Sequence, residues 1–112
     1  MRKVVPLALL AGLLGALLVA GPALSKTKSV ELDDNYFVHK GAPPTVTVHK
    51  GAKVEWEWEG RNPHNVTVTK GPVKFNSKTK TSGTFEKTLK KTGTYKIICT
   101  IHDDMKLRLK VQ

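Results

Sequence analysis

The stretch TYKIICTIHDDMKLRLKV, residues 94–111, joins two alternating segments through a short polar loop. In the second segment, residues 105–111, apolar side chains occupy every other position and lysine or arginine occupies the positions between them. A period of two places successive side chains on opposite faces of a β-strand. The stretch therefore predicts two strands, each with one buried face and one solvated face.

The same period recurs along the chain. KVEWEWE, residues 53–59, alternates strictly, with Val54, Trp56 and Trp58 on one face and glutamates on the other, so we expect both tryptophans in the core. Further strands are predicted near residues 29–32, 45–49, 64–68 and 84–89. Glycine and proline turns separate these segments, and the polar residues 76–82 read as a loop. The pattern predicts an all-β fold, an antiparallel sandwich or barrel.

The N-terminal segment has the features of an export signal. A basic MRK start precedes a long uncharged run, and Ala23 and Ser25 are the small residues that precede a cleavage site. We predict a signal peptide over residues 1–25 and one domain over residues 26–112. The alternative is a retained membrane anchor, because the apolar run is nearly long enough to span a bilayer. Both readings predict a periplasmic, extracellular or cell-surface location.

The domain is strongly basic. Removing Arg2 and Lys3 from the net charge of +10 leaves +8. Nucleic acid is an unsuitable partner for an exported protein, and the lysines are spread along the chain. Two readings stay open: a solvated face that keeps a monomer soluble, or steering towards redox partner proteins with acidic surfaces or an anionic membrane surface.

The loop after residue 98 carries three metal-ligand types. Cys99, His102 and Met105 are spaced by three, and the single cysteine cannot close an internal disulfide. Residues three apart in a strand lie about 10 Å from each other, so the loop must curl for these side chains to meet. His64 lies at the start of a predicted strand, at a sheet end, and adds a second imidazole. Two histidines, a thiolate and a weak thioether are typical of a blue-copper centre, whereas zinc prefers more thiolates or carboxylates.

Each residue alone has a purely structural reading. Cys99 could be a small buried apolar residue, His64 a strand-end histidine and Met105 part of the core, because it is in phase with the apolar face that follows. Only the four together predict copper. His39 and His49 have no such neighbours in the sequence and are predicted to lie on the surface.

Together the two motifs resemble the plastocyanin, pseudoazurin and amicyanin group of cupredoxins. PHNV at 63–66 is similar to the family's first-histidine motif, and CTIHDDM at 99–105 is similar to its C-terminal ligand loop in the short amicyanin form. TVTVHKGAKVEWEWEG at 45–60 looks like the strand pair before the first histidine. The resemblance covers nearly all of residues 29–112. It implies a Greek-key β-sandwich with one copper ion, cycling between Cu(I) and Cu(II), and one-electron transfer between redox proteins.

The resemblance also implies a role for each ligand. Cys99 would be the strong equatorial thiolate and His64 a buried equatorial ligand. His102 would be the equatorial ligand whose ring edge reaches the surface, where electrons leave. Met105 would be the long axial ligand.

Neighbouring residues would support these ligands. Asn65 would hydrogen-bond the cysteine side of the site with Thr100 as its partner. The chain departs from the family at Asp103 and Asp104, where apolar docking residues are common, and these two carboxylates weaken any apolar docking surface around His102.

Three functions follow in order of preference. The first is an exported one-electron carrier, which is not an enzyme. The second is a copper-binding protein for copper acquisition, storage or delivery. The third is an enzyme with Cys99 as nucleophile and His102 as base, for which the sequence offers no clear cleft or third orienting group.

Overall fold

The computed structural model describes residues 26–112; the predicted signal peptide or anchor lies outside the described residues. Within them, no helix is long and apolar enough to cross a bilayer. The described elements are strands β1 (Thr27–Asp33), β2 (Tyr36–Phe37), β3 (Thr45–Val48), β4 (Lys53–Trp58), β5 (Thr67–Lys70), β6 (Gly83–Thr88), β7 (Gly93–Ile98) and β8 (Lys106–Val111).

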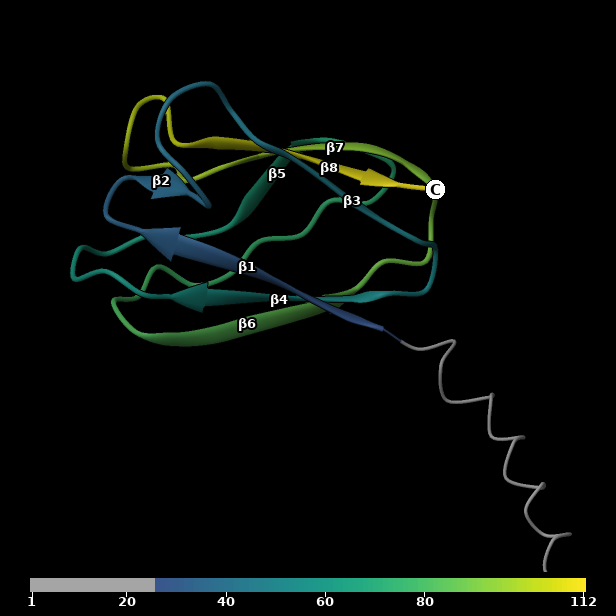
Figure 1. The fold of residues 1–112 in the computed structure, drawn as a ribbon, viewed down its shortest axis with the longest axis horizontal. Helices are drawn as coiled ribbons and strands as arrows, with labels where there is room; N and C mark the ends of the chain where they lie inside the picture. Colours follow the sequence, from purple (N-terminus) through teal and green to yellow (C-terminus); the bar gives the residue numbers. More distant parts are fainter. Residues whose placement is uncertain (1–25) are drawn as a thin grey trace, which may run out of the picture.

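The strands form two four-stranded sheets that face each other (Figure 1). Their orders are β2-β1-β4-β6 and β3-β8-β7-β5. The predicted alternation is confirmed: Val54, Trp56 and Trp58 of β4 point into the core, as do Leu107 and Leu109 of β8. Apolar side chains from both inner faces therefore make one core, and the predicted all-β sandwich is confirmed.

The expectation of purely antiparallel pairing is wrong. β1 pairs with β4 in parallel, and so does β3 with β8, while the other pairs are antiparallel. The reason is the connectivity: β3 and β4 are consecutive but belong to different sheets, so the parallel neighbours β1–β4 and β3–β8 are not consecutive in the chain. Crossing between the sheets gives a sandwich of the Greek-key type and not a closed barrel.

The predicted strand over residues 64–68 begins later than expected. His64 makes only an isolated bridge with Lys80, and β5 begins at Thr67 and contains a register shift between Val68 and Lys70. The predicted loop over residues 76–82 passes alongside this segment. His64 is therefore held at a sheet end by backbone hydrogen bonds to Lys80, 3.0 Å in both directions.

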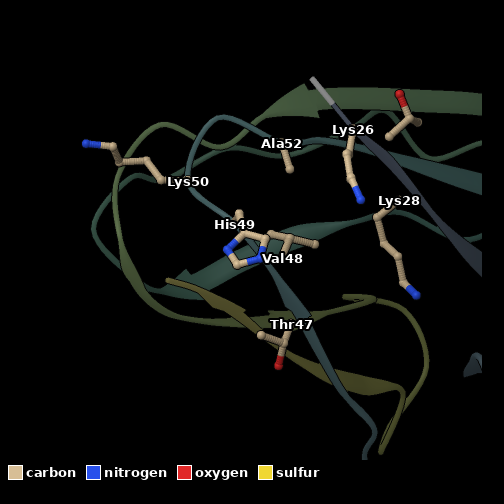
Figure 2. A pocket seen from close by; sticks show the side chains of 8 residues that line it. Lys26, Lys28, Thr47, Val48, His49, Lys50 and Ala52 are labelled. Carbon is tan, nitrogen blue, oxygen red and sulfur yellow. The ribbon is translucent and has the colours of Figure 1, made fainter. Parts of the chain in front are cut away.

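The two ends of the sandwich differ. β1 and β4 end beside the β7–β8 loop, at the left of Figure 1, and the C-terminus lies at the other end. Near the starts of β1 and β4 lies a cavity of about 410 Å³, and its lining includes Lys26, Lys28 and Lys50 (Figure 2). His49 lines it as well, and His39 and His49 are both exposed, as predicted.

Candidate metal centre

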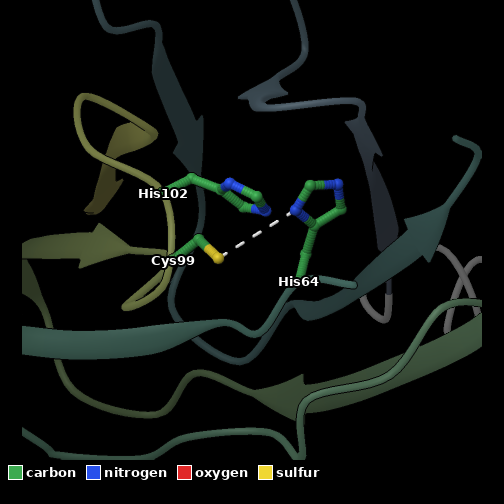
Figure 3. Close-up of side chains that lie close together, drawn as sticks. All are labelled: His64, Cys99 and His102. Atoms are coloured by element: carbon green, nitrogen blue, oxygen red, sulfur yellow. Dashed lines mark hydrogen bonds between the residues drawn. The ribbon is translucent and has the colours of Figure 1, made fainter. Parts of the chain in front are cut away.

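Three of the predicted ligands converge at the end of the sandwich formed by the ends of β1 and β4 (Figure 3). One ligand atom from each of His64, Cys99 and His102 lies within 4.8 Å of the others. His64 Nδ1 is 4.0 Å from Cys99 Sγ, and the two imidazole centroids are 4.8 Å apart. A nitrogen and a sulfur that lie about 2.0–2.3 Å from one ion are at most about 4.3 Å apart, so the 4.0 Å between His64 Nδ1 and Cys99 Sγ allows both to bind it. The connection between β4 and β5 and the β7–β8 loop therefore bring soft and borderline donors to one point.

The β7–β8 loop curls as its spacing requires. The Cys99 amide donates to the Met105 carbonyl at 3.1 Å, and the Met105 amide donates to the His102 carbonyl at 3.4 Å. Asp104 closes the turn with φ of 64°, a left-handed conformation that aspartate tolerates better than most residues. Met105 is fully buried and lines a small cavity of about 150 Å³ with Cys99 and His102. The fourth predicted ligand therefore lies beside the other donors of its loop.

The predicted link between the two ligand segments is confirmed. Asn65 Nδ2 donates to Thr100 Oγ1 at 2.8 Å, and the Thr100 amide donates back to Asn65 Oδ1 at 3.2 Å. The backbone N–H of Asn65 also lies 3.5 Å from Cys99 Sγ, within reach of an N–H to sulfur hydrogen bond. We call this pair of residues the Asn65–Thr100 clamp; it joins the segment after His64 to the segment after Cys99.

The His64 ring is in a suitable state to bind a metal ion, and the His102 ring is oriented for it. Burial, followed by the nearby His102, holds the pKa of His64 below its usual 6.5, which favours the neutral ring. His102 is half-buried, and its Nε2 faces the Pro63 carbonyl at 3.0 Å, so the tautomer that donates there carries its lone pair on Nδ1. Metal ligation requires neutral imidazole, so the donor set fits a copper ion.

Two further residues at the site were not assigned a role from the sequence. Trp58, read only as core, donates from Nε1 to the His64 carbonyl at 3.1 Å. Asp34 places Oδ1 3.8 Å from His64 Nε2. Asp34 and Asn35 are turn residues, and a turn signal does not indicate which distant side chain the turn will face.

The chain is similar to known copper proteins. A family model described as copper binding proteins, plastocyanin/azurin family, matches residues 26–112. A purple cupredoxin from Nitrosopumilus maritimus is 24% identical with a TM-score of 0.64, over 76% of this chain and 99% of that one. An oxidized amicyanin mutant is 24% identical with a TM-score of 0.62, over 77% of this chain and 82% of that one.

A copper-containing nitrite reductase from Thermus scotoductus SA-01 is 23% identical with a TM-score of 0.64, over 77% of this chain but only 22% of that one. At these identities the solved structures establish a shared fold. No curated protein matches the chain.

Proposed function

The chain belongs to the plastocyanin/azurin family of copper-binding proteins, and from this premise we propose that it is an exported one-electron carrier. Bound copper supplies a couple between Cu(I) and Cu(II). The observation that carries the proposal is the convergence of His64, Cys99 and His102 at one sheet end. With Met105 from the same loop, these residues form the proposed ligand set.

The protein surroundings suit a carrier. Cys99 and His64 are at most 2% exposed, so they are shielded from water, whereas His102 is half-buried and offers the route to the surface. The Asn65–Thr100 clamp joins the two ligand segments through the protein's own hydrogen bonds. Ligands held in this way move little when the charge of the site changes, which favours fast electron exchange over release of the ion.

An enzyme is less well supported. The cavity beside Cys99 and His102 has a volume of about 150 Å³, below the range of about 300–1,000 Å³ that is usual for small-molecule sites. We therefore propose that the site serves electron exchange and not catalysis.

The outer face of one sheet supports the proposal of an acidic partner. Lys70, Lys96 and Arg108 occupy directly paired positions on the neighbouring strands β5, β7 and β8, and all three are exposed. Strands β3, β5, β7 and β8 contain no carboxylate. Like charges directly opposite each other on a sheet are destabilising. A cation row kept at this cost suggests that a partner with negative charge uses the face.

The other sheet has the opposite sign. Glu31 on β1, Glu55 and Glu57 on β4 and Glu86 on β6 lie outside the core. The net charge of the whole domain therefore conceals two faces of different charge. Such a distribution orients an approaching charged partner as well as attracting it. We propose that the basic face guides an acidic redox protein, with an anionic cell surface as the competing outcome.

The first experiment is a titration of the metal-free protein with Cu(II), followed by visible absorption. One equivalent is expected to give an intense thiolate-to-copper band in the wild type and none in Cys99→Ser. Absence of the band in the wild type would contradict the proposal. Rapid loss of Cu(I) to a chelator, with slow electron exchange, would instead favour copper delivery.

The partner is tested with stopped-flow reduction by an acidic cytochrome. The rate for the wild type is expected to fall as ionic strength rises. At low salt, the rate for Lys96→Glu/Arg108→Glu is expected to be at least tenfold lower than that for the wild type. The matched control is Lys90→Glu/Lys91→Glu, which changes the net charge equally at exposed positions between β6 and β7. Equal rates for the two double variants would refute the basic face. The face would be assigned to the cell surface by a different result. In that case the wild type binds vesicles with anionic headgroups but not the cytochrome, and Lys96→Glu/Arg108→Glu does not bind the vesicles.

Export is tested separately. We propose that residues 1–25 direct export and that the domain acts in the periplasm or outside the cell. Mass spectrometry of the protein from the producing cells is expected to find a chain beginning at Lys26. A chain that keeps residues 1–25 in the membrane fraction would instead identify the segment as an anchor.

A further inference from the structure

We propose that Asp34 is a positioning residue of the metal centre: its carboxylate orients the His64 imidazole for ligation and strengthens the binding of Cu(II) relative to Cu(I). The inference rests on the proposed copper-binding function. It concerns a residue about 30 positions before the first ligand, in the turn between β1 and β2.

The ring nitrogen of His64 that faces away from the cysteine lacks a partner. Nε2 is completely buried and makes no hydrogen bond within residues 26–112. Its nearest ion-pair partner there is Asp34 Oδ1, at 3.8 Å. This distance is too long for a direct hydrogen bond, but a shift of less than 1 Å would form one. A buried N–H needs such an acceptor, so Nε2 and the Asp34 carboxylate suit each other.

The carboxylate is held in place by the chain that leads to His64. Asp34 Oδ1 accepts hydrogen bonds from the backbone amides of Arg61 at 2.8 Å and Asn62 at 2.9 Å. These two bonds, that of Asn62 first, hold the pKa of Asp34 below its usual range, so the group is ionised at neutral pH. A Cβ on Gly60 would collide with Asp34 Oδ1, so only glycine allows this approach. The β1–β2 turn is thus fastened to the segment that carries the ligand.

The consequence for His64 concerns its tautomer. A proton on Nε2, facing Asp34, leaves the lone pair on Nδ1, which is the nitrogen 4.0 Å from Cys99 Sγ. A carboxylate behind a ligating imidazole fixes the ring and raises its basicity, and its negative charge favours the more positive metal ion. A second acceptor near the ring is the backbone carbonyl of Asp33. The two acceptors therefore give different predictions for side-chain variants.

The test compares three variants. Asp34→Asn keeps an oxygen that can accept from Arg61 and Asn62 but removes the charge, Asp34→Ala removes both, and Glu59→Gln removes an exposed carboxylate elsewhere on the β4–β5 connection. Cu(II) affinity and reduction potential are measured on the loaded proteins. The tautomer of His64 is read from long-range proton–nitrogen NMR of the metal-free proteins.

Both Asp34 variants are expected to weaken Cu(II) binding about 10- to 100-fold, to change Cu(I) binding less and so to raise the potential. Asp34→Ala is also expected to lose the single Nε2–H tautomer, and Glu59→Gln to match the wild type. Cu(II) affinities within twofold of the wild type in Asp34→Asn would overturn the proposal and leave the Asp33 carbonyl as the positioning group. Should Asp34→Ala not fold, Asp34→Asn still decides. A wild type without a thiolate-to-copper band would refute the proposed function itself, which is a separate result.

Discussion

Substitution of Asn65 by alanine tests how the two ligand segments are held together. The buried side-chain amide group of Asn65 takes part in four hydrogen bonds. Nδ2 donates to Thr79 Oγ1 at 2.9 Å and to Thr100 Oγ1 at 2.8 Å, and Oδ1 accepts from Thr67 Oγ1 at 2.8 Å and from the Thr100 amide at 3.2 Å. None of them needs a metal ion, so the effect of the substitution should appear in the metal-free protein.

The magnitude follows from the number of bonds and from the exposure of their partners. A net contribution of about 1 kcal/mol for each hydrogen bond gives an upper value of about 4 kcal/mol. Thr79 and Thr100 are exposed, so their freed groups can bind water and recover part of this. We expect Asn65→Ala to lower the free energy of unfolding by about 2–3 kcal/mol, or the melting temperature by about 10–20 °C in a domain of this size.

The assay is urea unfolding of the metal-free protein, followed by tryptophan fluorescence. The midpoint should fall while the slope with denaturant stays constant, because the surface exposed on unfolding is nearly unchanged. Asn76→Ala is the matched control, since Asn76 is exposed and its amide makes one local bond, to the Ser77 carbonyl at 3.2 Å. It should change stability by less than about 0.5 kcal/mol. An equally small change in Asn65→Ala would refute the reasoning.

Three more substitutions probe other contacts. Burial, followed by the neighbouring Glu57 and Glu86, raises the pKa of Glu55 above 4.5, so the ionised carboxylate destabilises the folded protein at neutral pH. Glu55→Gln should therefore raise the melting temperature at pH 7 and leave it unchanged at pH 3, where the carboxyl group is protonated. A higher melting temperature at both pH values would contradict this. Trp58→Phe removes the bond to the His64 carbonyl and should cost about 1–3 kcal/mol in urea unfolding; unchanged stability would show that the bond contributes nothing. Gly60→Ala should expel the Asp34 carboxylate and reproduce the Cu(II) affinity of Asp34→Ala, whereas wild-type affinity would show that the carboxylate is not needed there.

Much of the site is readable from the sequence because its proposed ligands have local signatures. Cys99, His102 and Met105 fall within one loop, and residue type with spacing indicates what they can bind. Asn65 and Thr100 directly follow the proposed ligands His64 and Cys99, so their hydrogen bonds could be expected too. Asp34 has no such signature. Only the fold brings its turn within 3.8 Å of a ring that belongs to another connection.

The sequence by itself determined the buried face of strands such as β4 and β8, since alternation with period two places one side of a strand in the core and the other in solvent. It also determined the chemistry of the donors, since that depends on residue type. Tertiary structure alone decided which strands are neighbours. The parallel pairs β1–β4 and β3–β8 and the row of Lys70, Lys96 and Arg108 depend on register between segments far apart in the chain. Register follows from the packing of the whole core, and no local pattern specifies it.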